Sequence, residues 1–290
     1  MVSQSFKNHI SNLLSSKVKI VQPISGGDIS SAYKISTNSG VYFLKVNDNP
    51  EALRMFQTEA KALNIILDTN TIKTPTIIDV GTIDHVHFLL MEFVEAKSPN
   101  QKDMALFGKQ LAKMHQVSTN TFGLNFGNFI GSLPQSNKKH QNWNDFYIDE
   151  RLVPQLQLAN QKGLLHQSEI PETERMKSVC LNYFQNIKPS LLHGDLWSGN
   201  YVISKDGEPY LIDPAVYYGH SEVDIAMSKL FGGFGNEFYN AYYSIFPEDS
   251  NTSARIEIYQ LYYLLVHLNL FGSSYHRSVV SILKNYFNHC

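Results

Sequence analysis

The chain has 290 residues, of which 43% are hydrophobic and 17% charged, a composition ordinary for a folded protein with one large core or two smaller ones. Its formal net charge is −2 and its charged residues form no run, so we expect neither a nucleic-acid surface nor a membrane surface. The two cysteines, Cys180 and Cys290, lie far apart and the first residues lack a signal-peptide pattern, so we predict no disulfide, no zinc site and a cytoplasmic location.

The first part of the chain is predicted to be mostly β-strand with one helix. Residues 31–35 and 41–46 have strand character and flank a polar segment typical of a hairpin. Residues 51–68 carry apolar side chains at helical spacing, which predicts a helix. Two further strands are expected at residues 76–83 and 86–93.

From Ser98 onward helical patterns dominate the sequence. We expect helices at 103–117, 143–158, 172–186 and from 224 to the end, an ordered loop at 122–133, and a short β segment at 191–213. A sheet-rich part followed by a helical part indicates an α+β fold with two lobes. We predict a small antiparallel-sheet lobe at residues 1–95 and a larger, mainly helical lobe at residues 96–290.

Two strand-like stretches late in the β segment flank Asp206-Gly207. This pair favours a two-residue hairpin turn, because both turn positions need positive φ. With that turn, Asn200 would lie opposite Asp213, and facing residues in such a ladder are roughly 4.5–5.5 Å apart. An amide oxygen beside a carboxylate suits a hard cation such as Mg²⁺, although polar residues at a hairpin end are more often simply solvated.

The string HGDLWSGN at residues 193–200 places Asp195 five residues before Asn200. The spacing Asp-x4-Asn-x12-Asp that ends at Asp213 matches the catalytic loop and the metal-binding aspartate of kinases. We therefore predict that Asp195 orients an acceptor hydroxyl and takes its proton. We also predict that Asn200 and Asp213 hold a Mg²⁺ ion that bridges the phosphates of ATP, and that Asp224 accepts hydrogen bonds from the catalytic-loop backbone.

A lysine and a glutamate in the first lobe suit a bound nucleotide. Lys45 is an isolated cation in an apolar strand, and Glu59 lies beside the apolar stripe of the following helix. We predict that Glu59 pairs with Lys45 and positions it on the α- and β-phosphates of ATP. The alternative is that both are ordinary surface charges.

Two backbone segments could complete the ATP site. Gly26 and Gly27 separate two predicted strands, where backbone N–H groups could fold over phosphates, although a Gly-Gly pair also marks ordinary turns. The last predicted strand of the first lobe ends near Glu92 and Val94, and adenine could hydrogen-bond to the backbone there.

These stretches resemble the fructosamine kinase (ketosamine 3-kinase) family, a branch of the protein-kinase-like superfamily near the aminoglycoside and choline kinases. The resemblance covers nearly the whole chain and is most specific at residues 193–200 and at DPAVYYGHSE, residues 213–222. Trp197 stands where aminoglycoside-type relatives usually have a histidine. The resemblance implies ATP-dependent phosphorylation of the sugar 3-hydroxyl of a ketosamine, free or on a protein lysine, after which the adduct falls apart and the amine is regenerated.

The resemblance also bears on the substrate and on regulation. Trp197 could stack on an apolar sugar face, and His220 and His267 are further candidates for the sugar site, although a lone His or Trp is more often a packing residue. Some family members carry a cysteine in the glycine-rich loop that can act as a redox switch. Asp28 stands at that place here, so we expect no thiol regulation.

Two other functions remain open at the level of sequence. A kinase for an aminoglycoside or amino alcohol would need a strongly acidic site, and the acidic residues form no obvious cluster. A pseudokinase that only binds would be expected to lack Lys45, Asp195, Asn200 or Asp213, and all four are present. A protein kinase would show Ala-Pro-Glu after the metal-binding aspartate, which the sequence lacks. The preferred ketosamine and the oligomeric state stay undetermined.

Overall fold

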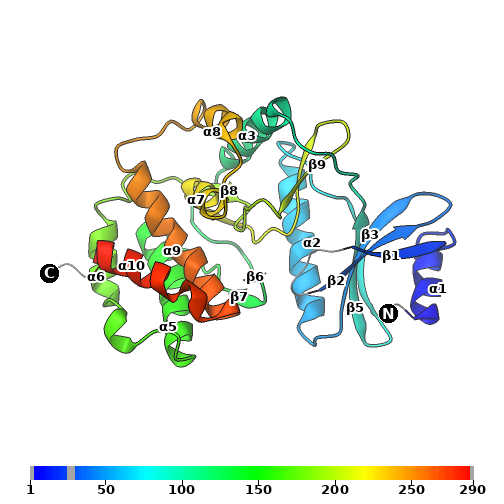
Figure 1. Cartoon of the computed structure of the whole chain (residues 1–290), viewed down its shortest axis with the longest axis horizontal. Helices are drawn as coiled ribbons and strands as arrows, with labels where there is room; N and C mark the ends of the chain where they lie inside the picture. Colours follow the sequence, from blue (N-terminus) through cyan, green and yellow to red (C-terminus); the bar gives the residue numbers. More distant parts are fainter. Residues whose placement is uncertain (1–2, 25–29, 288–290) are drawn as a thin grey trace. The chain divides into compact units, whose positions relative to one another are not determined.

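The computed structural model describes residues 3–24 and 30–287 (Figure 1). Its contacts divide the chain into two compact units, residues 1–98 with 202–213 and residues 99–201 with 214–290. The first unit is built on a sheet and the second is mainly helical, which confirms the predicted α+β class. Among the described residues, no helix has both the length and the apolar character needed to cross a membrane.

The described part of the first unit contains a five-stranded antiparallel sheet in the order β1-β2-β3-β5-β4 (Figure 1). Its strands are β1 (Ile20–Ile24), β2 (Ser31–Ser36), β3 (Val41–Asn47), β4 (Ile77–Ile83) and β5 (Val86–Glu92). The predicted hairpin between β2 and β3 is confirmed by their antiparallel pairing. Asp84 and His85 join β4 to β5 with φ of 49° and 67°, the left-handed values that a tight hairpin requires.

Two helices cover opposite faces of this sheet, α1 (Gln4–Leu13) and α2 (Ala52–Asp68) (Figure 1). Successive strand side chains point to opposite faces, so Leu44 packs with Phe6 and Ile10 of α1, whereas Lys45 points to the face covered by α2. The prediction of a single helix in this region is wrong. Only Phe6 and Ile10 of α1 are buried, an apolar stripe too short to stand out in the sequence.

A hairpin of β9 (Tyr201–Ile203) and β10 (Pro209–Leu211) follows residues 193–200, the predicted catalytic loop, which is called the catalytic string below. The N–H of Gly207 donates to the carbonyl of Ser204, the N–H of Ser204 donates to the carbonyl of Glu208, and Gly207 is left-handed at φ 87° while Asp206 is not. The loop therefore has three residues, a type I turn followed by a left-handed glycine. The predicted two-residue turn is wrong, and so is the register from which Asn200 was placed opposite Asp213.

This hairpin belongs to the first unit through backbone contacts. The N–H of Lys97 donates to the carbonyl of Ile203, and the N–H of Leu211 donates to the carbonyl of Lys73. Lys205 also forms an ion pair with Glu95 at 2.6 Å. The segment that ends at Asp213 is thereby tied to the sheet unit, although more than a hundred residues separate them in the sequence.

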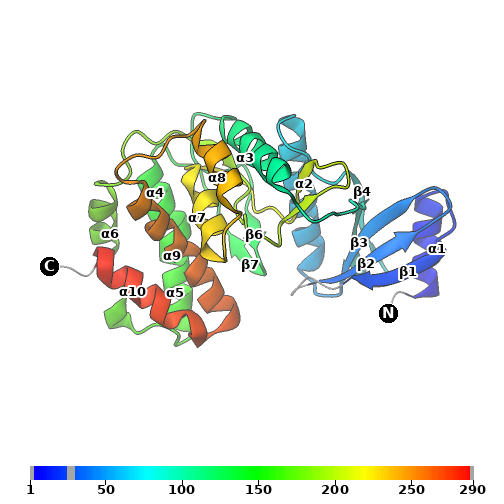
Figure 2. The ribbon, with the colours of Figure 1, turned by 45° about the horizontal axis from the view of Figure 1, so that its top comes forward.

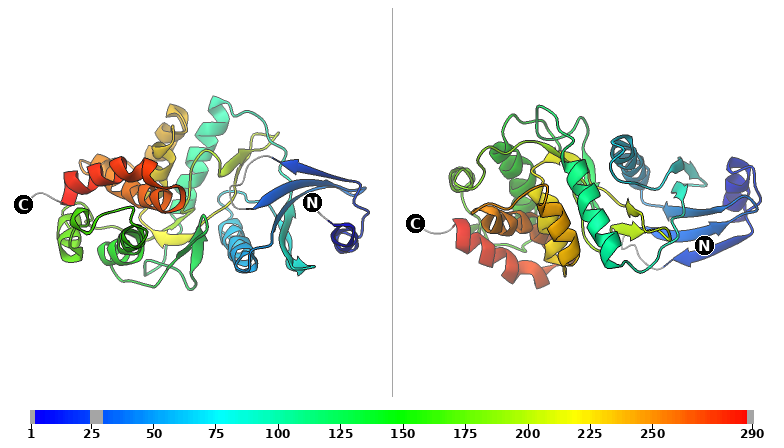
Figure 3. Two further views of the ribbon diagram at one scale, coloured as in Figure 1. Left: turned by 60° about the horizontal axis from the view of Figure 1, so that its bottom comes forward. Right: turned by 90° about the horizontal axis from the view of Figure 1, so that it is seen from above.

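The second unit is arranged around the long helix α9 (Thr252–Phe271), which packs against α5, α7 and α10 (Figures 2 and 3). Its other helices are α3 (Gln101–His115), α4 (Trp143–Tyr147), the π-helical turn η1 (Ile148–Leu152), α5 (Val153–Gln161), α6 (Thr173–Cys180), α7 (Glu222–Leu230), α8 (Asn236–Tyr243) and α10 (His276–Phe287), with 3₁₀ turns η2 (Gln167–Glu169) and η3 (Ser273–Tyr275). Two short antiparallel pairs complete it, β6 (Asn128–Ile130) with β7 (Leu133–Gln135), and β8 (Ser190–Leu192) with β11 (Tyr217–Gly219).

Three predicted segments of this unit differ from the structure. The helix expected to reach residue 186 ends at Cys180, and the chain then turns, with Asn186 left-handed at φ 56°. The helix expected at 143–158 is interrupted by η1, and the loop expected at 122–133 contains the strand β6.

The helix pair α3 and α8 gives a test of the packing. A Gly→Ala change inside a helix normally stabilises it by about 1 kcal/mol. At Gly108 an added Cβ would lie 2.3 Å from the carbonyl oxygen of Phe238, so Gly108→Ala should instead destabilise the protein by about 1–3 kcal/mol. Urea unfolding measures this, with Lys109→Ala on the exposed face as control. A stabilised Gly108→Ala variant would contradict the close packing.

Candidate active site

A buried lysine in the first unit pairs with two carboxylates. Lys45 of β3 lies with its Nζ 2.7 Å from the Oε1 of Glu59 on α2, which is the ion pair predicted from the sequence. It also pairs with the Oδ1 of Asp213, which follows the β9–β10 hairpin. The side chains of Lys45 and Glu59 are 14% and 17% exposed, whereas that of Asp213 is 43% exposed. The structure thus brings together three of the predicted site residues.

Burial and the neighbouring charges have opposite effects on the pKa of Lys45. Burial disfavours the charged form of Lys45, but the carboxylates of Asp213 and Glu59 outweigh it and raise the pKa of Lys45 above its usual value. Burial also raises the pKa of the Glu59 carboxyl, with Lys45 opposing the rise and Asp213 adding to it. Lys45 therefore remains a fixed cation at neutral pH, suited to holding an anionic group.

Asp213 has an unusual backbone conformation for a non-glycine residue. Its φ is 53°, in the left-handed region that costs most residues of order 1 kcal/mol or more but that aspartate tolerates better than most. Such strain clusters at functional sites, where the surrounding structure holds it in place. The backbone of Asp213 therefore supports a functional role independently of its ion pair.

The other residues of the first unit that are predicted to bind ATP differ in their surroundings in the structure. The carboxylate of Glu92 accepts hydrogen bonds from the N–H and the hydroxyl of Thr76, both at 3.1 Å, so this side chain joins the two strands. Val94 lies just beyond β5, and its backbone makes no hydrogen bond with another described residue. Gly26 and Gly27 lie outside the described residues, as does Asp28.

The catalytic string of the second unit begins directly after β8 and is held by buried groups. The fully buried carboxylate of Asp224 accepts hydrogen bonds from the N–H groups of His193 at 2.7 Å and Gly194 at 2.9 Å, which confirms the predicted backbone role of Asp224. The Nε2 of His115 lies 3.1 Å from the same carboxylate. The hydroxyl of Tyr263 donates to the carbonyl of Gly194 at 2.9 Å. His115 and Tyr263 carried no recognisable signal in the sequence.

Asp195 and Asn200 lie side by side in this loop. The Nδ2 of Asn200 donates to the Asp195 backbone carbonyl at 2.8 Å and to its carboxylate at 3.1 Å, and Asn200 is only 5% exposed. The N–H of Asp195 donates to the Nδ1 of His193 at 3.2 Å. Because Asn200 donates through its nitrogen, its Oδ1 is turned away from Asp195, and that oxygen is the atom a hard cation requires.

Trp197 presents an aromatic face to solvent beside this pair. It is 39% exposed, a large value for tryptophan, and its indole ring folds over Gly199. A Cβ at Gly199 would lie 2.5 Å from the ring, so the glycine makes room for the indole. An exposed aromatic face two residues after Asp195 is suited to stacking on the apolar face of a ligand.

His267 is placed near the supports of the same loop. It lies one helical turn after Tyr263 on α9, and its Nδ1 donates to the Tyr263 carbonyl at 2.8 Å. The rings of Phe231, Phe271 and Tyr275 surround it at centroid distances of 4.8, 5.5 and 5.2 Å. Burial lowers the pKa of His267, which favours the neutral imidazole.

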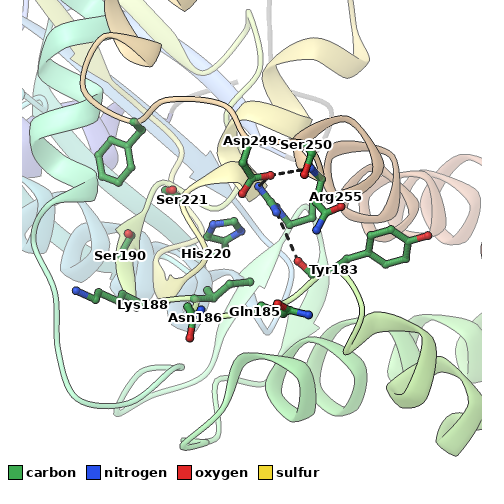
Figure 4. A pocket seen from close by; sticks show the side chains of 13 residues that line it. Tyr183, Gln185, Asn186, Lys188, Ser190, His220, Ser221, Asp249, Ser250 and Arg255 are labelled. Carbon is green, nitrogen blue, oxygen red and sulfur yellow. Dashed lines mark hydrogen bonds and ion pairs between the residues drawn. The ribbon is translucent and has the colours of Figure 1, made fainter.

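His220 is not brought to the catalytic string. It follows β11, whose Gly219 pairs with Ser190, whereas Tyr217 pairs with Leu192 next to His193, so His220 lies at the far end of β8. Its ring lines a polar cavity of about 540 Å³ and lies beside Ser190 (Figure 4). The Nδ1 lies 2.9 Å from the Tyr259 hydroxyl, and burial lowers the pKa of His220 to about 3.

The tight path of the catalytic string depends on Gly194. Its φ is 85°, and an added Cβ would lie 2.2 Å from the carbonyl oxygen of Ala215. Gly194→Ala should therefore lower stability by about 1–3 kcal/mol in thermal or urea unfolding. Gly163→Ala is the matched control, because Gly163 has φ 68° but no atom within 4 Å of an added Cβ. Equal losses in the two variants would show that the Ala215 contact is unimportant.

Comparison with known proteins identifies the family. A sequence model described as fructosamine kinase matches residues 2–289. The chain is 39% identical over 268 residues to "Probable ketoamine kinase" of Enterococcus faecium, covering 92% of this chain and 95% of that protein. It is 39% identical over 276 residues to "Protein-ribulosamine 3-kinase, chloroplastic" of Oryza sativa subsp. indica, covering 93% and 79%.

A solved structure supports the same assignment. The crystal structure of "Putative fructosamine-3-kinase" from Haemophilus somnus 129PT superposes with a TM-score of 0.87 at 28% sequence identity and covers 99% of this chain and 97% of its own. The likeness therefore extends over both units. The chain belongs to the fructosamine kinase family and has its kinase-like fold.

Proposed function

We propose that this protein transfers the γ-phosphoryl group of ATP to the sugar 3-hydroxyl of a ketosamine. The observation that carries the proposal is the fixed pair of Asp195 and Asn200 with the exposed face of Trp197 beside it, in a chain that belongs to the fructosamine kinase family. The relatives named ketoamine kinase and ribulosamine 3-kinase support this substrate class. Loss of the phosphorylated sugar would then regenerate the free amine.

Asp195 is the proposed catalytic base. Its carboxylate would accept a hydrogen bond from the 3-hydroxyl and take the proton as the oxygen attacks phosphorus. The hydrogen bonds from Asn200 and to His193 fix the loop that carries it, so little reorganisation is needed during the reaction. The transfer is direct and forms no covalent enzyme intermediate.

Lys45 is the proposed ligand of the ATP phosphates. Its charge is maintained by Glu59 and Asp213, and Glu59 restricts the direction of the ammonium group. The backbone of Val94 offers a donor and an acceptor for adenine, whereas the carboxylate of Glu92 supports the strand.

Mg²⁺ is the proposed metal, and the donor atoms fit it. Asn200 offers an amide oxygen and Asp213 a partly exposed carboxylate, both hard oxygen ligands of the kind Mg²⁺ prefers. The ion would neutralise charge on the phosphates.

The proposed sugar site contains Trp197, and His267 on α9 is a further candidate for it. Trp197 would stack on the sugar ring, and the neutral imidazole of His267 would give a hydrogen-bonding group without charge. His220, which lies at the far end of β8, is left out of this site. The amine carried by the sugar can be free or part of a protein lysine.

A substrate panel tests the function. The protein, ATP and Mg²⁺ are incubated with fructosamine, ribulosamine and erythrulosamine adducts, with an aminoglycoside and with choline, and products are identified by ³¹P NMR. We expect a sugar 3-phosphate from at least one ketosamine and none from the other two classes. Phosphorylation confined to the aminoglycoside or choline would overturn the substrate class.

Asp195→Asn tests the catalytic base. The amide keeps the shape of the side chain but cannot take a proton, so kcat should fall by about 10²–10⁴-fold while ATP binding is retained. Steady-state kinetics and calorimetric titration with ATP and Mg²⁺ measure the two effects. Asp206→Asn, on the exposed hairpin turn, is the control and should leave both unchanged. Normal turnover by Asp195→Asn would refute the assignment.

A further inference from the structure

An arginine is fully buried in the second unit without a carboxylate partner. Arg151 lies in η1, the π-helical turn between α4 and α5, and it forms no ion pair with any described residue. Its guanidinium carbon lies 4.0 Å from the ring centroid of Tyr217 and 4.7 Å from that of Phe146. These aromatic faces offset part of the cost of burying the charge. A π-turn and an unpaired buried cation are both costly features, so a function is expected for them.

The guanidinium begins a chain of buried amide side chains. The Nη2 of Arg151 donates to the Oδ1 of Asn137 at 2.7 Å, and the Nδ2 of Asn137 donates to the Oδ1 of Asn128 at 2.9 Å. The Nδ2 of Asn128 then donates to the backbone carbonyl of Val216 at 2.9 Å. Both asparagines are at most 3% exposed, so water cannot replace these partners.

A second branch meets the chain at Asn128. The Nε2 of Gln135, which pairs with Asn128 across the β6–β7 ladder, donates to the Oδ1 of Asn128 at 2.8 Å and to the carbonyl of Ala215 at 3.3 Å. The Oε1 of Gln135 accepts from the hydroxyl of Tyr262 at 2.6 Å. Each branch therefore ends with a side-chain N–H that donates to a backbone carbonyl, and the two carbonyls belong to the consecutive residues Ala215 and Val216.

Arg151 and the backbone carbonyls together determine the direction of this chain. A guanidinium only donates hydrogen bonds, so Asn137 must turn its oxygen toward it and its nitrogen toward Asn128. Asn128 in turn must present its oxygen to Asn137 and Gln135 and its nitrogen to Val216. The Nδ2 of Asn137 also donates to the backbone carbonyl of Phe126 at 3.1 Å, so the guanidinium and this carbonyl favour the same orientation of the amide. Without the guanidinium, the Oδ1 of Asn137 would lose its donor and the head of the chain would be held less firmly.

The carbonyls at the end of the chain belong to the segment that adjoins the catalytic loop. The N–H of Ala215 donates to the carbonyl of His193 at 2.8 Å. The backbone of Gly194 packs directly on Ala215, where a Cβ would lie 2.2 Å from the Ala215 oxygen. Gly194 immediately precedes Asp195. The orientation of the Ala215 peptide therefore affects the position of the backbone that carries Asp195.

We propose that Arg151 is a positioning residue for Asp195, acting through the directed chain of Asn137, Asn128 and Gln135 on the Ala215 peptide. This inference rests on the proposed catalytic role of Asp195. It assigns the π-helical turn a task in turnover beyond packing, since η1 places Arg151 at the head of the chain.

Two substitutions of Arg151 distinguish the effect of its hydrogen-bond donors from the effect of its side-chain volume. Arg151→Met fills similar space but donates nothing, so the Oδ1 of Asn137 loses its donor and the chain is held less firmly. The kcat should then fall by about 10–100-fold, the scale expected for a small misplacement of a catalytic group. Arg151→Lys remains donor-only and should recover much of this loss. KM for ATP should change less than kcat in both, because Lys45 and its partners, the proposed phosphate-binding group, belong to the first unit.

Asn137→Asp tests the chain without removing the cation. It gives Arg151 a carboxylate partner, but it replaces the Nδ2 that donates to Asn128 and to the Phe126 carbonyl by an acceptor oxygen. A directed chain predicts a kcat loss similar to that of Arg151→Met. A purely structural role of Arg151 predicts normal kcat, so this variant remains informative if Arg151→Met fails to fold.

The matched control is Tyr147→Phe. It removes a buried hydrogen bond to the Ile258 carbonyl at 2.8 Å that is not part of the chain, and it should lower the unfolding temperature while kcat per folded molecule stays unchanged. Unchanged kcat in Asn137→Asp and Arg151→Met, or an equal loss in Tyr147→Phe, would overturn the inference. If Asp195→Asn retains turnover, the proposed function fails instead, and the two failures are thereby distinguished.

Discussion

The catalytic loop depends on one buried carboxylate. The carboxylate of Asp224 has no exposure to water and accepts hydrogen bonds from the N–H groups of His193 and Gly194. The ring of His115, which is itself fixed by Tyr242, lies against the same carboxylate. An isolated charge would be very costly there, so the folded state strongly favours the loop conformation that supplies these donors. The positive φ of Gly194 and its contact with Ala215 follow from this requirement.

The second unit uses buried polar groups to hold its helices in register around this loop. Arg255 on α9 binds Glu222 at the start of α7 through two nitrogens, at 2.6 and 2.7 Å. Trp143 donates to the hydroxyl of Tyr259, again on α9. Each of these buried polar groups needs its hydrogen-bond partner at one position, so the helices are held in one relative placement. An apolar core of the same volume would not specify that placement. Precise placement of polar groups is what phosphoryl transfer requires, since the reaction gains mainly from positioning and charge stabilisation.

Much of the fold and part of the site could be predicted from periodicity and motifs. The alternation of Tyr42, Phe43 and Leu44 around Lys45, and the helical stripe that contains Glu59, were sufficient to predict their ion pair. The helix α1 and the three-residue turn before Glu208 were missed because their local signals are short or shared by several turn types. The exclusion of His220 from the catalytic loop needed the β8–β11 register, which three-residue strands do not reveal in a sequence.

The sequence by itself determined the family and the α+β class, and it predicted Lys45, Asp195, Asn200 and Asp213 as site residues, because side-chain chemistry and close spacing along the chain can be read from it directly. Only the tertiary structure decided that residues 202–213 join the sheet unit, that Asp213 shares Lys45 with Glu59, and that Arg151 heads a chain of amides. These contacts join residues far apart in sequence. They form in the arrangement of the chain that gives every buried hydrogen-bond donor and acceptor a partner. A short stretch of sequence cannot reveal that arrangement, because the partners come from distant parts of the chain.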